Sequence, residues 1–195
     1  MAEAKKLDKR IIRTRQQLTE AFFEALEEKG FQNMTVQDIT DKAGVNRATF
    51  YDHYEDKTDL FNSIIDHTFQ QKLDNKIPAV AEFNLTNLKV LILAVFEYLG
   101  QLHKIASRSG VEHELSVETR IQPKIEALIL DWLSKSRSAR TKWSSTPEIT
   151  ASVVSWSIFG AGLMWSKEGT RESAEHIADN TLLLIAGGVY GSLID

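Results

Sequence analysis

The chain has 195 residues, of which 43% are hydrophobic and 26% charged, and its formal net charge at pH 7 is −4. Because it has no cysteine, disulfides, thiolate chemistry and cysteine-based zinc sites are excluded. Its polar start is unlike a secretory signal, and its longest apolar stretches, 153–165 and 182–194, are too short to cross a bilayer, so a cytoplasmic location is expected.

The first predicted helix runs from about Leu7 to Lys29, and Gly30 ends it. An amphipathic helix of this length has one apolar stripe that faces a core. The stripe is formed by Ile11, Leu18, Phe22 and Leu26.

Positive charge is concentrated at the beginning of this helix. Residues 5–15 carry six basic side chains and one acidic side chain, whereas residues 1–60 together carry a net charge of −2. Such a cluster suits the phosphate backbone or the minor groove of DNA, and Arg10 and Arg13 are the candidate contacts. The alternative is a helix end that is only solvated.

Residues 35–54, TVQDITDKAGVNRATFYDHY, predict two short helices joined by a glycine turn. Thr35 is a typical N-cap, with Asp38 in the capping-box position. Gly44 ends the first helix because glycine adopts the left-handed conformation at low cost. A pair of this kind on a three-helix platform is a helix-turn-helix, whose second helix enters the DNA major groove.

The second short helix is capped by Asn46, and its buried edge is formed by Phe50 and Tyr54. Its other face offers groups that suit DNA. Arginine donates to guanine, an asparagine amide pairs with adenine, small side chains meet thymine methyl groups, and tyrosine and histidine bond phosphates. The candidate contacts are Thr35, Asn46, Arg47, Ala48, Thr49, Tyr51 and His53. Asp52 is a negative exception on this face, and an ordinary solvated hairpin is the alternative.

The segment Gly30–Phe61 resembles the DNA-binding domain of the TetR (tetracycline-repressor-like) family of bacterial transcriptional regulators. The family pattern is Gly-Phe, then T-x-x-x-I-x-x-x-A-G-V, then T-x-Y-x-H-Y/F-x-x-K-x-x-L. This chain supplies Gly30, Phe31, Thr35, Ile39, Ala43, Gly44, Val45, Thr49, Tyr51, His53, Tyr54, Lys57 and Leu60. The remaining residues resemble the family only in length and helical character.

The resemblance implies an all-α protein with two domains. An N-terminal three-helix helix-turn-helix DNA-binding domain is expected at 1–74, and a C-terminal helical ligand-binding and dimerisation domain at 75–195. It also implies that Lys57 contacts a DNA phosphate; the alternative is that Lys57 is only a surface lysine.

Helices are predicted for the rest of the chain as well. Asp56 caps a fourth helix that ends near Leu73 and joins the two domains, and a linker containing Pro78 follows. Further helices are expected at about 86–107, 117–135, 147–167 and 172–194. The polar, basic segment 134–145 is expected to be an exposed loop, with a second DNA contact as the alternative.

The last two predicted helices are apolar on nearly every side, which requires burial on two sides. In TetR-like proteins these helices form a four-helix interface with a second copy, so a homodimer and a roughly palindromic operator are expected. The alternative is that both are core helices of a monomer. The candidate interface residues are Val153, Trp156, Gly160, Met164, Leu182, Ile185 and Val189.

TetR-like proteins also commonly enclose a small-molecule cavity among their middle helices. Candidate lining residues are His67, Phe96, Tyr98, His103, Glu112, His113, Trp132, Trp156 and Phe159. Each of them could instead be an ordinary core or surface residue. No H-E-x-x-H or other tight histidine pair is present in the sequence, so no metal and no cofactor are expected besides a small-molecule effector of unknown identity.

The sequence lacks the G-x-S-x-G, G-x-x-x-x-G-K and G-x-G-x-x-G motifs of common enzyme classes. It therefore predicts a non-enzymatic, sequence-specific transcriptional regulator, a homodimeric repressor that a small ligand relieves. The alternative is a TetR-fold protein-interaction module or coactivator that does not bind DNA. Such a module would not need the motif residues at positions 35, 47, 49, 51, 53 and 57 together.

Overall fold

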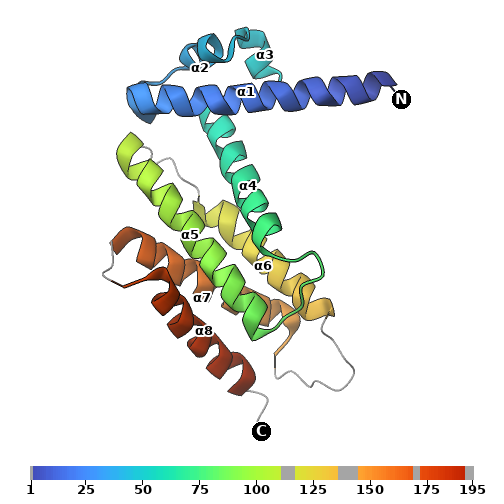
Figure 1. The fold of residues 1–195 in the computed structure, drawn as a ribbon, viewed down its shortest axis with the longest axis vertical. Helices are drawn as coiled ribbons and strands as arrows, with labels where there is room; N and C mark the ends of the chain where they lie inside the picture. The colour runs from blue at the N-terminus through green and yellow to red at the C-terminus, as the bar shows by residue number, and fades with distance from the viewer. Residues whose placement is uncertain (1, 111–116, 136–144, 169–171, 192–195) are drawn as a thin grey trace. The chain divides into compact units, whose positions relative to one another are not determined.

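The computed structural model describes residues 2–110, 117–135, 145–168 and 172–191 (Figure 1). All regular elements in these ranges are helices, which confirms the predicted all-α fold class. In chain order they are α1 (Ala2–Asn33), α2 (Val36–Ala43), α3 (Arg47–Tyr51), α4 (Lys57–Lys76), α5 (Leu85–Ser109), α6 (Val117–Lys135), α7 (Pro147–Glu168) and α8 (Ala174–Gly191).

These helices form two compact units. The first, called the head, comprises residues up to Ile65 with the described part of 105–115, and so contains α1, α2, α3 and the first half of α4. The second, called the body, comprises Asp66–Lys104 and the described residues from 117 onward. The sequence places the domain boundary at residue 74, whereas the division into compact units falls between Ile65 and Asp66, within α4. The domain boundary at 74 stays a prediction.

The head is built on α1, and α2 and α3 lie along this helix (Figure 1). Phenylalanine rings form its core: Phe22 of α1 stacks on Phe61 of α4 with ring centroids 5.3 Å apart, and Phe31 lies 5.8 Å from Phe61. Aromatic pairs of this kind add about 0.5–1.5 kcal/mol beyond the burial of their surface.

One residue of the predicted α1 stripe is not buried. Ile11 is 36% exposed, and the first buried side chain described in α1 is that of Thr14. The prediction for Ile11 is wrong because the first turns of α1 extend beyond the part of the helix that the core covers.

The core of the body depends on close contact between α5 and α7. The rings of Phe96 and Trp165 stack with their centroids 5.9 Å apart. An added Cβ at Gly162 would lie 2.9 Å from the Phe96 ring, so this position of α7 requires glycine for the helices to approach. A buried hydrogen bond of 3.0 Å from Gln122 to the Ser155 hydroxyl joins α6 to α7.

Helices α5 and α7 are long and apolar enough to cross a membrane by length and composition alone, each with a mean hydropathy of 1.3. The conclusion that no stretch is long enough to cross a bilayer considered only uninterrupted apolar runs, so it was too strict. Both helices supply core side chains to the body, such as Val95 of α5 and Ile158 of α7, which are fully buried. A core helix of a globular protein passes the same test, so no membrane span is inferred.

Candidate nucleic-acid interface

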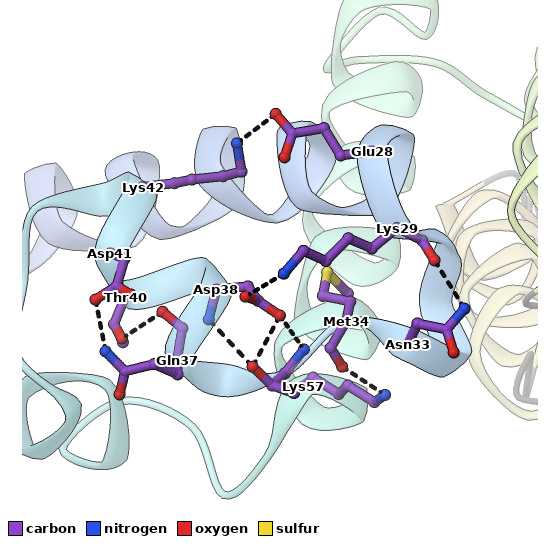
Figure 2. Close-up of polar contacts among 11 residues, drawn as sticks. Glu28, Lys29, Asn33, Met34, Gln37, Asp38, Thr40, Asp41, Lys42 and Lys57 are labelled. Carbon is purple, nitrogen blue, oxygen red and sulfur yellow. Dashed lines mark hydrogen bonds and ion pairs between the residues drawn. The ribbon is translucent and has the colours of Figure 1, made fainter.

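The start of α2 is organised around the carboxylate of Asp38 (Figure 2). The Asp38 backbone N–H donates to Thr35 Oγ1 at 3.2 Å, and the Thr35 N–H donates to Asp38 Oδ2 at 2.9 Å. Lys29 of α1 donates to Asp38 Oδ1 at 2.6 Å. The predicted capping box is confirmed, and the lysine additionally ties it to α1.

These contacts lower the pKa of Asp38 from 3.8 to about 2. The largest cause is the hydrogen bond from the Lys29 ammonium, followed by the backbone N–H and the hydroxyl of Thr35. The carboxylate is therefore ionised at every physiological pH, and its bonds to α1 and α2 persist.

A second ion pair attaches the other end of α2 to α1. Lys42 Nζ lies 2.6 Å from Glu28 Oε1 (Figure 2). It also lies 3.9 Å from Glu24 Oε2. Both ends of α2 are thereby fixed along the same helix.

The turn after α2 and the start of α3 have the expected geometry. Gly44 adopts a φ of +65°, in the left-handed region, and its N–H donates to Asp41 O at 3.3 Å. Asn46 Oδ1 accepts the N–H of Thr49 at 2.7 Å and so caps α3. Phe50 and Tyr54 are 0% and 6% exposed, which confirms the predicted buried edge.

The outward surface of α3, called here the α3 face, consists of Arg47, Ala48 and Tyr51. All three are exposed. The Arg47 guanidinium lies 5.8 Å from the centroid of the Tyr51 ring, and its Nη2 donates to the Tyr51 hydroxyl at 3.2 Å. The tyrosine thus orients the guanidinium while leaving it other N–H groups, and an oriented guanidinium suits guanine or phosphate.

Three predicted DNA contacts are already engaged within the head. The Thr35 hydroxyl donates to Asp38 Oδ2 at 2.8 Å. Asn46 Oδ1 is the cap of α3, so pairing with adenine through both amide atoms would make this oxygen accept a second hydrogen bond beside that from Thr49. The ammonium of Lys57 is bound to backbone carbonyls. A DNA role of these three side chains competes with a structural one.

The other predicted contacts differ in exposure. Arg10 and Arg13 are exposed on α1, whereas Thr49 and His53 are half-buried. Arg15 was missed as a candidate contact: its guanidinium lies 6.0 Å from the Tyr54 ring centroid, so it is held against the end of the helix-turn-helix. In the sequence, the one signal for Arg15 as a DNA contact was its position in the basic cluster of residues 5–15.

On α7 of the body, the predicted interface residues lie on one exposed stripe. Val153, Trp156 and Met164 are 60%, 45% and 46% exposed, Gly160 is exposed as well, and Ile149 extends the stripe at 57%. Helical spacing places these positions on one face. Most of the side chains on this stripe are apolar, and the exposed Ser157 lies among them.

On α8 the predicted and observed outward residues differ. Ile185 is 6% exposed and faces the core of its own body, and Leu182 is half-buried. The side chain of Val189 lies outside the described residues. Leu183 and Leu184, 70% and 79% exposed, face outward instead. A helix that is apolar all round does not reveal from sequence which side is outward.

The predicted ligand residues are dispersed through the body. Phe96 and Phe159 are buried, Trp156 and His67 are exposed, and His103 is half-buried. Burial raises the pKa of Tyr98 to about 12, against the opposing effect of its 2.8 Å hydrogen bond with Thr68. Glu112 and His113 lie outside the described residues.

Of the described candidates, Trp132 lines a cleft. The cleft has a volume of about 360 Å³ and lies where the end of α4 and the following loop meet α6. It is lined by Gln70, Leu73, Asp74, Ile77, Pro78, Ala79, Lys124, Ala127, Leu128, Asp131 and Trp132. This volume is in the range of small-molecule sites, which is roughly 300–1,000 Å³.

Comparison with known proteins agrees with the geometry of the head. Residues 18–64 match the model of the bacterial regulatory proteins of the tetR family. The chain is 33% identical over 115 residues to the uncharacterised HTH-type transcriptional regulator YxbF of Bacillus subtilis (56% of this chain, 30% of YxbF). It is 38% identical over 61 residues to the probable acrEF/envCD operon repressor of Escherichia coli K12 (31% of this chain, 28% of that protein).

These matches span about three tenths of the length of those curated relatives. A solved structure, FadR from Bacillus subtilis in complex with stearoyl-CoA, shares the fold of the chain. Its TM-score is 0.58 at 16% identity, over 89% of this chain and 98% of the other.

The capped helix pair, its glycine turn and the exposed α3 face define a helix-turn-helix protein with a separate helical body. Residues 18–64 match the model of the tetR family of bacterial regulatory proteins, as the motif in 30–61 predicts.

Proposed function

We propose that the chain is a sequence-specific DNA-binding transcriptional repressor rather than an enzyme. The observation that carries this proposal is the α3 face, where Tyr51 orients an exposed Arg47 at the position from which a helix-turn-helix reads bases. Arg47 and Tyr51 contact the major groove, Ala48 and Thr49 contact base methyl groups, and Arg10 and Arg13 contact the backbone. The names of the curated relatives, a regulator and a probable operon repressor, support the same role.

The protein acts as a homodimer. The exposed apolar stripe of α7 and the outward Leu183 and Leu184 of α8 would each be unfavourable in water, and a second copy buries them. Added Cβ atoms at Gly160, Gly187 and Gly188 would meet nothing within 4 Å, so these positions leave room for a partner's side chains. A two-fold dimer presents two α3 faces, and the operator is accordingly a rough palindrome.

A small molecule that binds the body relieves repression. The cleft beside Trp132 offers a site of suitable volume, lined by apolar and by charged side chains, and a protein of the same fold has been solved with stearoyl-CoA bound. Ala127 is an exposed lining residue, so Ala127→Trp should fill the cleft. In a screen for compounds that release operator DNA, compounds active on the wild type should lose their effect on this variant.

Because the protein acts on DNA, its location is the cytoplasm.

The experiment that tests the proposal is selection of bound fragments from random DNA at low salt, followed by sequencing. A two-fold symmetric sequence should be enriched. If none is enriched, DNA reading is rejected and the protein-interaction module becomes the better account.

A further inference from the structure

Lys57, in the first turn of α4, holds the junction between α1 and α2. Its Nζ donates to the carbonyl oxygens of Phe31 at 2.7 Å, Met34 at 2.8 Å and Gln32 at 3.4 Å. Figure 2 shows the contact with Met34. The same ammonium lies 4.7 Å from the centroid of the Phe31 ring. An ammonium has three N–H donors, and each has a carbonyl within reach here.

The carbonyls that Lys57 binds follow a break in α1. Gly30 has a φ of +69° and a ψ of 162°, so the helical hydrogen bonding is interrupted there and the carbonyls around the break need other donors. Met34 N–H satisfies Gly30 O at 3.1 Å, and the Asn33 side chain satisfies Lys29 O at 3.2 Å. Lys57 supplies the cation for the remaining carbonyls at the negative end of this helix.

The contact also closes a ring within the head. From the α1–α2 junction the chain passes through α2, the glycine turn and α3, and it returns at Lys57 to the residues that it left. Asp56 fixes the start of α4 in this position, because its Oδ1 accepts the Asp59 N–H at 2.8 Å. The α3 face therefore lies on a segment whose two ends one ammonium joins.

We infer that Lys57 is a positioning residue that sets the orientation of α3, and not the phosphate contact that the family resemblance implies. A phosphate would have to compete with three carbonyls for the same three N–H groups. This inference rests on the proposed DNA-binding function, and its test separates the two.

The decisive variant is Lys57→Arg, which keeps the positive charge. An arginine replaces a lysine well at a phosphate, whereas its planar guanidinium cannot direct three N–H groups to three converging carbonyls. At a temperature where circular dichroism shows the variant fully folded, its affinity for the selected operator should fall at least tenfold. Its affinity for unrelated DNA should fall less than threefold, because no charge is lost.

Lys57→Met removes the charge and is compared with Lys42→Met, which removes a charge from an exposed ion pair of the same head. Lys57→Met should lose operator preference as Lys57→Arg does. Its salt dependence of binding should match that of Lys42→Met. A phosphate contact would instead lower the slope by about one per monomer, which would overturn the inference.

Two further outcomes decide against the inference. If Lys57→Arg binds the operator like the wild type, the lysine acts through charge alone. If the variants melt earlier but bind normally when folded, the lysine stabilises the head without positioning α3. If the wild type itself selects no DNA sequence, it is the proposed function that fails.

A measurement on the wild-type protein keeps the inference testable should the variants not fold. In ¹⁵N-lysine-labelled protein, the Lys57 ammonium should give a slowly exchanging NMR signal that operator DNA leaves in place. No such signal, or its displacement on DNA binding, would contradict the inference.

Discussion

Asp38 joins three parts of the head through one carboxylate. It accepts from Lys29 of α1, from the Thr35 backbone and from the Thr35 hydroxyl. The capping half of this arrangement could be predicted, since Thr35 and Asp38 are three residues apart. The pairing with Lys29 could not, because it requires the chain to turn at Gly30.

The lowered pKa of Asp38 predicts a pH dependence of stability. A carboxyl whose pKa is lower in the folded than in the unfolded state stabilises the protein above about pH 3.8, and this contribution is lost as the pH falls toward about 2. Wild type should exceed Asp38→Asn in unfolding free energy at pH 6, and the difference should narrow between pH 4 and pH 2. Urea unfolding of both proteins at each pH measures this difference in unfolding free energy. A difference that does not vary with pH would contradict the lowered pKa of Asp38.

Lys57 shows the limit of sequence reasoning for single residues. The motif includes this position, but the carbonyls that bind the ammonium are 23–26 residues away in the chain. Only the folded geometry reveals that this lysine has internal partners. Asn46 is different, because its capping bond to Thr49 is local and was predictable.

At the scale of helices, the boundaries were largely predictable because they depend on local signals. The helix expected at 117–135 is α6, and Pro147 is the first residue of α7. Which side of an all-apolar helix faces outward was not predictable, as Ile185 and Leu184 of α8 demonstrate with 6% and 79% exposure. That choice is made by neighbouring helices.

The turn between α2 and α3 gives a prediction for a single backbone position. An added Cβ at Gly44 would meet nothing within 4 Å, so only the backbone conformation at φ +65° penalises a side chain there. Gly44→Ala should destabilise the protein by about 1–2 kcal/mol. Gly44→Asn is the control and should cost less, because asparagine tolerates this conformation. Thermal unfolding of the wild type and the two variants measures these costs. Equal unfolding midpoints for all three proteins would show that alanine causes no strain in the turn.

For the whole molecule, the exposed apolar surface of α7 and α8 predicts a dimer. Leu184→Glu places a charge on this surface and should convert the dimer to a monomer at micromolar concentration. The control is Val80→Glu, at a position that is 87% exposed outside these two helices, and it should leave the dimer intact. Sedimentation equilibrium measures both. A monomeric wild type, or a dimeric Leu184→Glu variant, would exclude this interface.

The net charge of −4 also belongs to the whole molecule. Because so few phosphate contacts are expected from one copy, we expect the affinity for DNA to depend on two heads acting together. The monomeric Leu184→Glu variant should therefore lose operator binding although its α3 face is unchanged. Gel-shift titration at one salt concentration shows this, and normal binding by the monomeric variant would contradict it.

The reading of bases by the α3 face is tested most directly with Arg47→Ala. Its affinity should be measured by fluorescence anisotropy for the selected operator and for operators with each base pair exchanged. The variant should lose about 1–3 kcal/mol on the operator and become indifferent to one base pair in each half-site. An Arg47→Ala protein with wild-type affinity and unchanged base preference would contradict the assignment of α3 as the element that reads DNA.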